Sequence, residues 1–200
     1  MICTMSNVTF EDVLGFWFAG REQNEPAVDA RMNGWFGNDP AFDAEISARF
    51  CGLVEQALSG ELDNWAHEPR GQLALILLLC QFPRHIYKNS RRAFGGDRRA
   101  LKLCEQGVTS GDFKRLSELE QLFFFMPLQR IESIKIQKTS VKIFESLARR
   151  VSDTLRSTFD TVSQFAELRH DVIAQFGRFP HRNELLGRAN TGEEDAFLSA

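Results

Sequence analysis

The residues best suited to chemistry lie together near the C-terminus, between His170 and Asn183. This stretch combines imidazole, guanidinium and amide groups: His170, Arg178, His181, Arg182 and Asn183. Arginine binds carboxylates and phosphates through paired hydrogen bonds, and histidine exchanges protons near neutral pH. The residue types therefore indicate either a site for an anion or a site for acid–base chemistry.

Two helices are expected to meet at this stretch. Apolar residues at helical spacing, such as Phe159 and Ile173, predict a long amphipathic helix that ends at Gly177. Pro180 suits the first turn of a second, short helix, because the amide proton it lacks would be unpaired there. A corner between helices leaves main-chain groups unpaired. The polar side chains could therefore tie the corner down by hydrogen bonds, or they could form an anion pocket.

A glutamate from an earlier helix is the expected partner of the corner arginines. Residues 128–151 have the spacing of one long helix, with Glu132 and Gln137 beside its apolar stripe rather than opposite it. A carboxylate at the edge of a core needs a partner, and the arginines of the corner supply one. Metal binding by His170 and His181 is the least favoured alternative, since the further ligands of such a site are not grouped with them.

The rest of the chain predicts helices only. One helix is expected to start after Asp39, which precedes a proline, and to stop at Gly60. The apolar run Leu73–Cys80 predicts a buried central helix, which Pro83 should kink or end. The spacing of Thr191–Glu194 is that of a capping box before a terminal helix. No stretch alternates as a strand does, so we expect an all-α protein with one domain over residues 1–200.

The composition excludes several classes of protein. A chain of 200 residues can bury one sizeable core, and a net charge of −3 argues against a nucleic-acid partner. The basic residues between Arg84 and Lys102 are interpreted as a solvated face. No apolar run has membrane-spanning length, and no signal-peptide pattern is present. The four cysteines are isolated, which is typical of reduced thiols in a cytoplasmic protein.

Four segments resemble the DUF924 family. They are Asp12-Val-Leu-Gly-Phe-Trp-Phe18, Leu73–Arg84, Phe125-Met-Pro-Leu128 and, above all, Phe176-Gly-Arg-Phe-Pro-His-Arg-Asn183. The resemblance covers residues 13–198 and implies antiparallel helix pairs packed as a right-handed, tetratricopeptide-like array. It implies no activity and no cofactor, because the family is named for having no assigned function.

The resemblance also carries candidate ligand-binding residues over to this chain. They are the polar residues that match the family's pattern: Arg84, Tyr87, Glu132, Gln137, Arg178, His181, Arg182, Asn183 and Arg188. The chain departs from that pattern at Gly15 and Cys80, which replace aspartates, and at Arg130, which replaces a histidine. An arginine cannot act as a base near neutral pH, so Arg130 favours binding over acid–base catalysis. Cys80, in an apolar helix, is interpreted as an inert buried thiol.

Three functions are consistent with these residues. The favoured hypothesis is a cytoplasmic protein that binds a small anionic molecule through Arg84, Glu132, Gln137 and the corner residues. The second is an enzyme in which His170 or His181 is the general acid or base and works with Glu132. The third is a scaffold for a peptide or protein partner, since stacked helix pairs often form a groove. No feature of the sequence indicates a metal, a cofactor or an oligomeric state.

Overall fold

Helices make up all the regular secondary structure in the computed structural model, which describes residues 8–18 and 25–200. The all-α prediction is confirmed. The α-helices are α1 (Phe10–Trp17), α2 (Glu25–Phe36), α3 (Pro40–Ser59), α4 (Pro69–Ile76), α5 (Phe82–Ile86), α6 (Asp97–Ser110), α7 (Glu118–Phe125), α8 (Ile134–Arg150), α9 (Arg156–Phe176), α10 (Asn183–Leu186) and α11 (Gly192–Ser199). Short 3-10 turns join many of them, and one π-helical turn, η2 (Leu77–Gln81), connects α4 to α5.

The ends of several helices follow from local sequence. The Asp39 carboxylate accepts hydrogen bonds from two amides of the first turn of α3, both over 3.1 Å. Gly60 and Gly177 end α3 and α9 in the left-handed conformation, with φ of +95° and +70°. Thr191 and Glu194 form the capping box of α11. These predicted starts and stops are confirmed.

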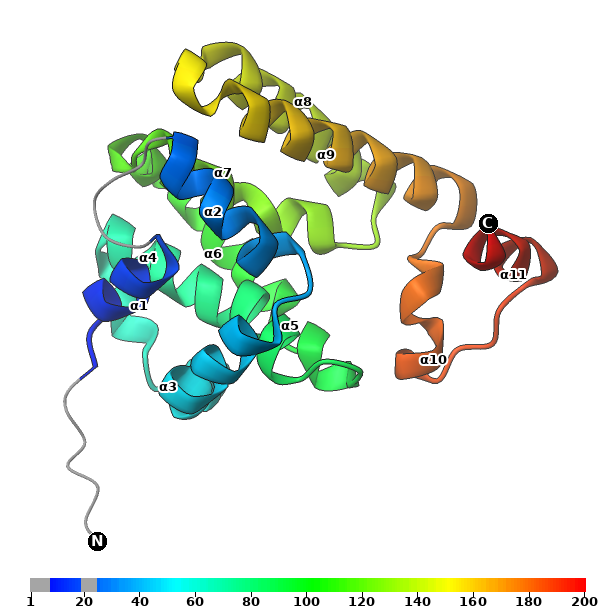
Figure 1. Ribbon diagram of the computed structural model, residues 1–200, viewed down its shortest axis with the longest axis horizontal. Helices are drawn as coiled ribbons and strands as arrows, with labels where there is room; N and C mark the ends of the chain where they lie inside the picture. The colour runs from blue at the N-terminus through cyan, green and yellow to red at the C-terminus, as the bar shows by residue number, and fades with distance from the viewer. Residues whose placement is uncertain (1–7, 19–24) are drawn as a thin grey trace, which may run out of the picture.

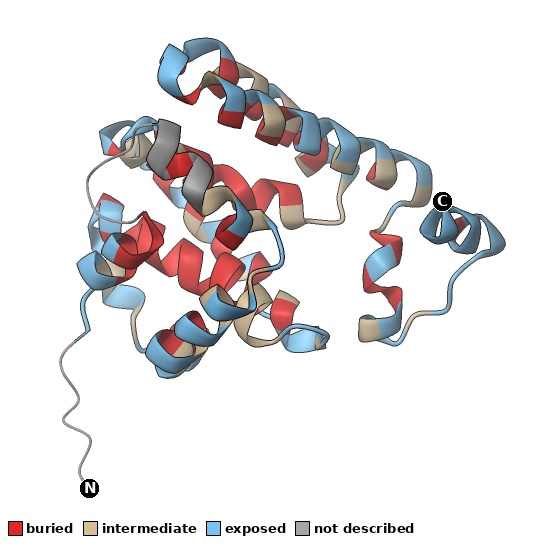
Figure 2. Ribbon diagram, viewed as in Figure 1, coloured by how far each residue is buried: buried red, intermediate tan, exposed pale blue. Residues whose placement is uncertain are grey.

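The segment α4–η2–α5 runs through the centre of the molecule, and Figure 2 shows it as largely buried. Every side chain in the run Leu73–Cys80 is at most 1% exposed. Aromatic rings from α1, α2 and α7 pack beside it. The ring centroids of Trp35 and Phe123 are 4.9 Å apart, and those of Trp17 and Phe123 are 5.4 Å apart. One hydrophobic core extends from α1 to α9, which supports our prediction of a single domain.

The π-helical turn η2 lies where the sequence predicts a break at Pro83. Pro83 has no N–H to donate to the carbonyl of Leu79, four residues earlier. The main chain at Gly96 approaches that same carbonyl so closely that a Cβ there would lie 2.2 Å from its oxygen. The chain continues directly as α5, with Pro83 in its first turn. Turns of this kind are frequent at functional sites, and here the turn brings Gln81 and Arg84 out of the core toward a cavity.

Helices α8 and α9 form a hairpin along one side of the molecule (Figure 1). The predicted helix over residues 128–151 is wrong at its start, because Met126–Arg130 forms a 3-10 turn and α8 begins at Ile134. The Gln137 amide donates to the carbonyls of Ile131 and Leu128, over 2.8 and 3.3 Å, which satisfies main-chain groups of this turn. The tetratricopeptide-like order of the helix pairs stays a prediction. None of the described helices is long and apolar enough to cross a membrane.

Candidate functional site

Two ion pairs hold the C-terminal corner together. Arg178 donates from Nε and Nη2 to the carboxylate of Glu194, both over 2.6 Å, and this lowers the pKa of Glu194 to about 2. Arg188 donates to both oxygens of Glu132, over 2.7 and 2.9 Å, and the main-chain N–H of Phe179 donates to Glu132 over 2.8 Å. Burial raises the pKa of Glu132, but these bonds offset it and leave the pKa below its usual value. Glu132 thus pairs with Arg188, which follows the predicted corner, rather than with Arg178 or Arg182.

Arg182 and Asn183 are buried inside the same corner. The Arg182 guanidinium carbon lies 4.8 Å from the ring centroid of Phe94 and 4.4 Å from that of Phe179. Its Nη1 donates to the main-chain carbonyl of Arg130 over 2.9 Å. The Asn183 amide donates to neighbouring side chains of the corner. Each of these contacts holds the corner in place. Most of the predicted site residues at the corner are therefore already paired with groups of the protein itself.

The histidines predicted as acid or base do not meet Glu132. His170 Nδ1 lies 3.0 Å from the Asp171 carboxylate, and its ring faces a different cavity, between α8 and α9. His181 is exposed, with its ring centroid 5.6 Å from that of Phe179. Partial loss of hydration at its ring, which packs beside Phe179, followed by the charges of nearby arginines, lowers the pKa of His181 to about 4. Neither imidazole is bonded to the Glu132 carboxylate, so the structure does not assemble the acid–base pair expected from the sequence.

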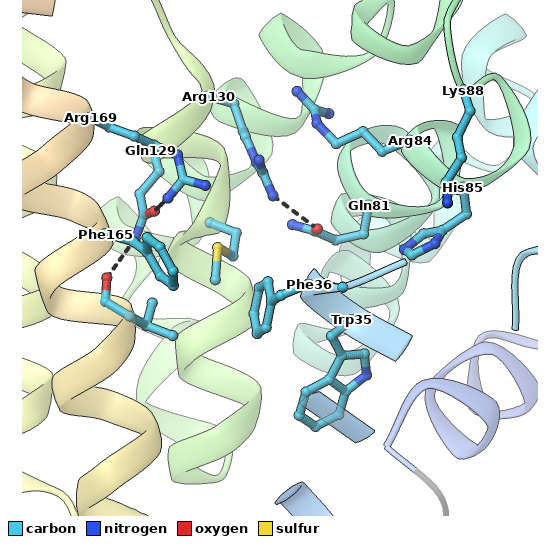
Figure 3. Close-up of a pocket in the computed structure, with 13 residues that line it drawn as sticks. Trp35, Phe36, Gln81, Arg84, His85, Lys88, Gln129, Arg130, Phe165 and Arg169 are labelled. Atoms are coloured by element: carbon cyan, nitrogen blue, oxygen red, sulfur yellow. Dashed lines mark hydrogen bonds between the residues drawn. The ribbon is translucent and has the colours of Figure 1, made fainter. Parts of the chain in front are cut away.

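A cavity of about 270 Å³ lies between α2, α5, α9 and the 3-10 turn η5 (Met126–Arg130). Figure 3 shows side chains that reach it from all four elements. Its lining includes four cations (Arg84, Lys88, Arg130 and Arg169), and none of the described residues that line it is acidic. Among the predicted ligand-binding residues only Arg84 lines it. Tyr87 instead donates a hydrogen bond to the carboxylate of Glu55.

Two of the four cations are neutralised by carboxylates behind the cavity wall. Arg84 donates from Nη1 and Nη2 to the two oxygens of Asp97, both over 2.8 Å. Lys88 donates to Asp43, which is also bonded to His85 Nδ1 over 2.8 Å. Burial raises the pKa of Asp43, but its bonds to Lys88 and His85 bring the pKa below the usual value. The Asp43 carboxylate is therefore negatively charged at neutral pH.

The other two cations, Arg130 and Arg169, have no carboxylate partner among the described residues. Arg130 donates to the amide oxygen of Gln81 over 3.3 Å, and its buried Nε has no hydrogen-bond partner there. Burial, followed by the charge of Arg84, lowers the pKa of Arg130. Arg169 donates to the amide oxygen of Gln129. Burial, followed by the charge of Arg130, lowers the pKa of Arg169 to about 9.

Buried guanidiniums that meet only neutral amides are unfavourable in a folded protein, because charge removed from water requires an opposite charge. Perturbed groups of this kind cluster at functional sites. The arrangement can neutralise and hydrogen-bond an anion that enters the cavity.

His85 is the one imidazole in the lining of this cavity. Its side chain is 8% exposed, and its ring packs edge-on against Trp17 and Phe42. Burial lowers the pKa of His85, so the ring is neutral at pH 7. Because Nδ1 faces the Asp43 carboxylate, Nδ1 carries the proton and Nε2 is left as the acceptor. The ring can therefore accept a proton from a molecule in the cavity.

Comparison with known proteins identifies the family of this chain. The family model for "Bacterial protein of unknown function (DUF924)" matches residues 13–200. The chain belongs to the DUF924 family. It is also similar to the solved structure of a protein of unknown function from Agrobacterium tumefaciens, with 30% identity and a TM-score of 0.78 over 94% of this chain and 96% of the other. None of the curated proteins matches the sequence.

Two of the three expected departures from the DUF924 pattern, Cys80 and Arg130, lie against each other; Arg130 lines the cavity, whereas Cys80 is buried behind it. The Cys80 thiol lies against the Arg130 guanidinium, and burial raises the pKa of Cys80, so the thiol is neutral. In place of an aspartate and a histidine, the chain has a neutral group and a fixed cation. Gly15 lies on the exposed face of α1, outside the lining of this cavity.

Sequence reasoning missed most of the residues that line the cavity. They come from four separate elements and are Gln81, His85, Lys88, Gln129, Arg130 and Arg169. Two signals were available in the sequence. Arg130 was already a departure from the DUF924 pattern, and Arg169 follows Phe165 at the four-residue spacing that puts both side chains on one face of a helix.

Proposed function

We propose that this DUF924 protein binds a small organic anion in the cavity lined by Arg84, Arg130 and Arg169. One observation carries the proposal: Arg130 is partly buried in the cavity wall, and among the described residues it has no carboxylate partner and its buried Nε has no hydrogen-bond partner. An anion that enters the cavity would supply the missing charge and accept the free hydrogen bonds. The proposed site is thus next to the C-terminal corner rather than inside it.

The size of the cavity and the state of the thiols support a small metabolite of the cytoplasm. A volume of about 270 Å³ is slightly below the range of cavities that hold drug-sized ligands. Among the described cysteines, Cys51, Cys80 and Cys104 are free thiols, whereas Cys3 lies outside the described residues. Free thiols are typical of reducing compartments. The proposed function is therefore still the binding of a small anion, but the binding residues are those of the cavity rather than those of the corner.

Thermal-shift measurements with a library of anionic metabolites test the proposal. The protein is first unfolded in urea and refolded, so that any anion bound during expression is removed. A ligand at about 100 times its Kd stabilises the folded state by about 2.7 kcal/mol, which raises the Tm of a chain of this size by about 5–10 °C. We expect Arg130→Gln to abolish this rise.

The matched control is Arg149→Gln, which removes the same charge from a side chain that is 70% exposed on α8. This variant should keep the ligand-induced rise in Tm. The proposal is refuted if no anion raises the Tm of the refolded wild-type protein, or if both variants respond to the anion as the wild type does.

A second candidate function is acid–base catalysis on the bound anion. It is favoured by His85, which lies in the cavity with its Nδ1 fixed by Asp43 and its Nε2 available as a base. In this function His85 is the general acid or base, the role that the sequence assigned to His170 or His181. Asp43 orients it, as Glu132 was expected to do. Once a ligand is known, transfer of its acidic protons to deuterated water is measured by NMR. His85→Gln should abolish any exchange above the buffer rate but retain binding, and equal exchange in both proteins would exclude this function.

A further inference from the structure

The cavity has a positively charged end and an aromatic end. In Figure 3 the guanidiniums of Arg169 and Arg130 lie at one end, and the rings of Phe36 and Trp35 lie toward the other. The ring of Phe165 lies beside Arg169, with its centroid 5.7 Å from the guanidinium carbon. A ligand that fills both ends has an anionic group and an apolar group. The following inference rests on the anion-binding function proposed above and specifies the chemical class of the ligand.

The charge of the ligand follows from the pairing of the cations. Arg84 and Lys88 are neutralised by Asp97 and Asp43, which leaves two guanidiniums in the lining without a carboxylate among the described residues. A singly charged anion would leave one of these partly buried guanidiniums uncompensated, and that is costly in a partly enclosed cavity. An anion with two negative charges balances both. Polyanions such as nucleic acids are excluded by the volume of about 270 Å³.

The apolar end is made of rings that are held in place by the core. Trp35 is 4% exposed, and its Nε1 donates to the carbonyl of Trp17 over 3.1 Å. Phe36 stacks on Phe123, with ring centroids 5.9 Å apart and an interplanar angle of 6°. Phe165 is different, since 43% of it is exposed. Two rigid walls and one exposed ring suit a flat apolar group, which aromatic side chains contact through their faces.

The geometry points to a ligand with a dianionic head, either a phosphate monoester or two neighbouring carboxylates, joined to a planar ring. The guanidiniums of Arg130 and Arg169 bind the head, while Trp35, Phe36 and Phe165 contact the ring. Both kinds of head share the same chemistry, which is a compact double negative charge that accepts several hydrogen bonds. The two kinds are separated by the choice of probes.

Isothermal titration calorimetry with four probes tests this inference, at pH 8 and fixed ionic strength. Phenyl phosphate and phthalate each carry two charges and a ring at this pH, benzoate carries a ring and one charge, and inorganic phosphate carries the charge without a ring. A charge-assisted hydrogen bond contributes about 1.5–3 kcal/mol, so one dianionic probe should bind about 10-fold to 100-fold more tightly than benzoate. The tighter of phenyl phosphate and phthalate identifies the head, and it should also bind more tightly than inorganic phosphate.

Three variants separate the roles of charge and ring. Arg130→Gln and Arg169→Gln should each weaken binding of the dianionic probe by at least about 10-fold, and should change benzoate binding less. Phe165→Ala, at an exposed position, should weaken the ring-bearing probes more than it weakens inorganic phosphate, because its ring contacts both the probe and Arg169. Circular dichroism and thermal melting confirm that each variant is folded. If one of the two arginine variants fails to fold, the other still tests the role of the positive charge.

The outcomes distinguish this inference from the function on which it rests. If benzoate binds as tightly as both dianions, the protein binds anions, but the inference that its ligand carries two charges is wrong. If inorganic phosphate binds as tightly as phenyl phosphate and phthalate, the inference that the ligand carries a planar ring is wrong. If the four probes fail to bind but another anion raises the Tm, the proposed function holds and the ligand class is overturned. If no anion binds at all, both are overturned.

Discussion

Replacing Arg169 with Met should make the ligand-free protein more stable, although it removes a charged group from the proposed site. A guanidinium placed to bind an anion is unfavourable in the empty protein, because it is buried close to other cations. Burial, followed by the charge of Arg130, lowers the pKa of Arg169 to about 9, and this fall corresponds to about 5 kcal/mol against the charged side chain in the folded state. Met keeps the length and apolar character of the side chain, and it removes this penalty.

The losses caused by the same change are smaller. The amide oxygen of Gln129 loses the hydrogen bond from Arg169, which costs about 1–3 kcal/mol if the oxygen stays unpaired. The guanidinium also lies 5.7 Å from the ring centroid of Phe165, a contact that contributes about 0.5–1 kcal/mol. The net gain is therefore about 1–3 kcal/mol, or a rise in Tm of at least about 2 °C for a chain of this size.

Arg188→Met is the matched control within the same protein. Arg188 makes two hydrogen bonds to Glu132, so its loss leaves a partly buried carboxylate without its partner and should lower stability by about 1–3 kcal/mol. Both variants and the wild type are refolded from urea and compared by urea denaturation and thermal melting at pH 7.5. Opposite signs for the two variants are expected. If Arg169→Met lowers stability as Arg188→Met does, Arg169 is a structural residue and the reasoning about unpaired guanidiniums is refuted.

Three further predictions concern pH, packing and the corner. Burial lowers the folded-state pKa of His85, although its bond to Asp43 opposes this, and partial loss of hydration followed by nearby arginines lowers the pKa of His181 to about 4. The unfolded chain therefore binds more protons than the folded protein below about pH 6.5. Urea denaturation should show stability falling from pH 7 to pH 4.5, less steeply in His181→Asn. Gly96→Ala places a Cβ 2.2 Å from the carbonyl oxygen of Leu79 and should lower stability by about 1–3 kcal/mol. Gly52→Ala, where no such atom lies within 4 Å, should raise stability by about 0.5–1 kcal/mol in the same melts. Arg178→Ala should speed amide hydrogen exchange in α11, because Arg178, just after α9, holds Glu194 of α11. The same change should leave anion affinity unchanged. A loss of affinity would show that the anion binds at the corner instead of in the cavity.

The sequence alone determined the fold class and many helix ends, because those features depend on residues close together in the chain. A cap such as Asp39 or Thr191 bonds to amides two or three residues away, and a glycine such as Gly177 ends a helix through its own backbone angle. Where a long-range contact decides, local reasoning fails. The start of α8 was wrong because the Gln137 amide satisfies the carbonyls of a turn that the hydrophobic spacing alone assigns to the helix.

Membership of the DUF924 family was also evident from the sequence, since the segment from Phe176 to Asn183 is a contiguous stretch. The roles of its residues were not. Arg188 lies 56 positions from Glu132, and Arg178 lies 16 positions from Glu194, yet these pairs hold the corner. Each arginine has the same chemistry whether it binds a ligand or a carboxylate of its own chain. Only the positions of the partners in three dimensions separate the two roles.

The cavity was decided entirely by tertiary structure. Arg84, Arg130 and Arg169 come from α5, η5 and α9, and nothing in their local sequence shows that the three side chains meet in one cavity. A hydrophobic pattern indicates which face of a helix is covered, but it does not say which other element covers it or what charge that element carries. Arg84 pairs with Asp97 of α6, whereas the partners of Arg130 and Arg169 among the described residues are amide oxygens. The difference between a neutralised cation and one left for an anion exists only after the helices have packed.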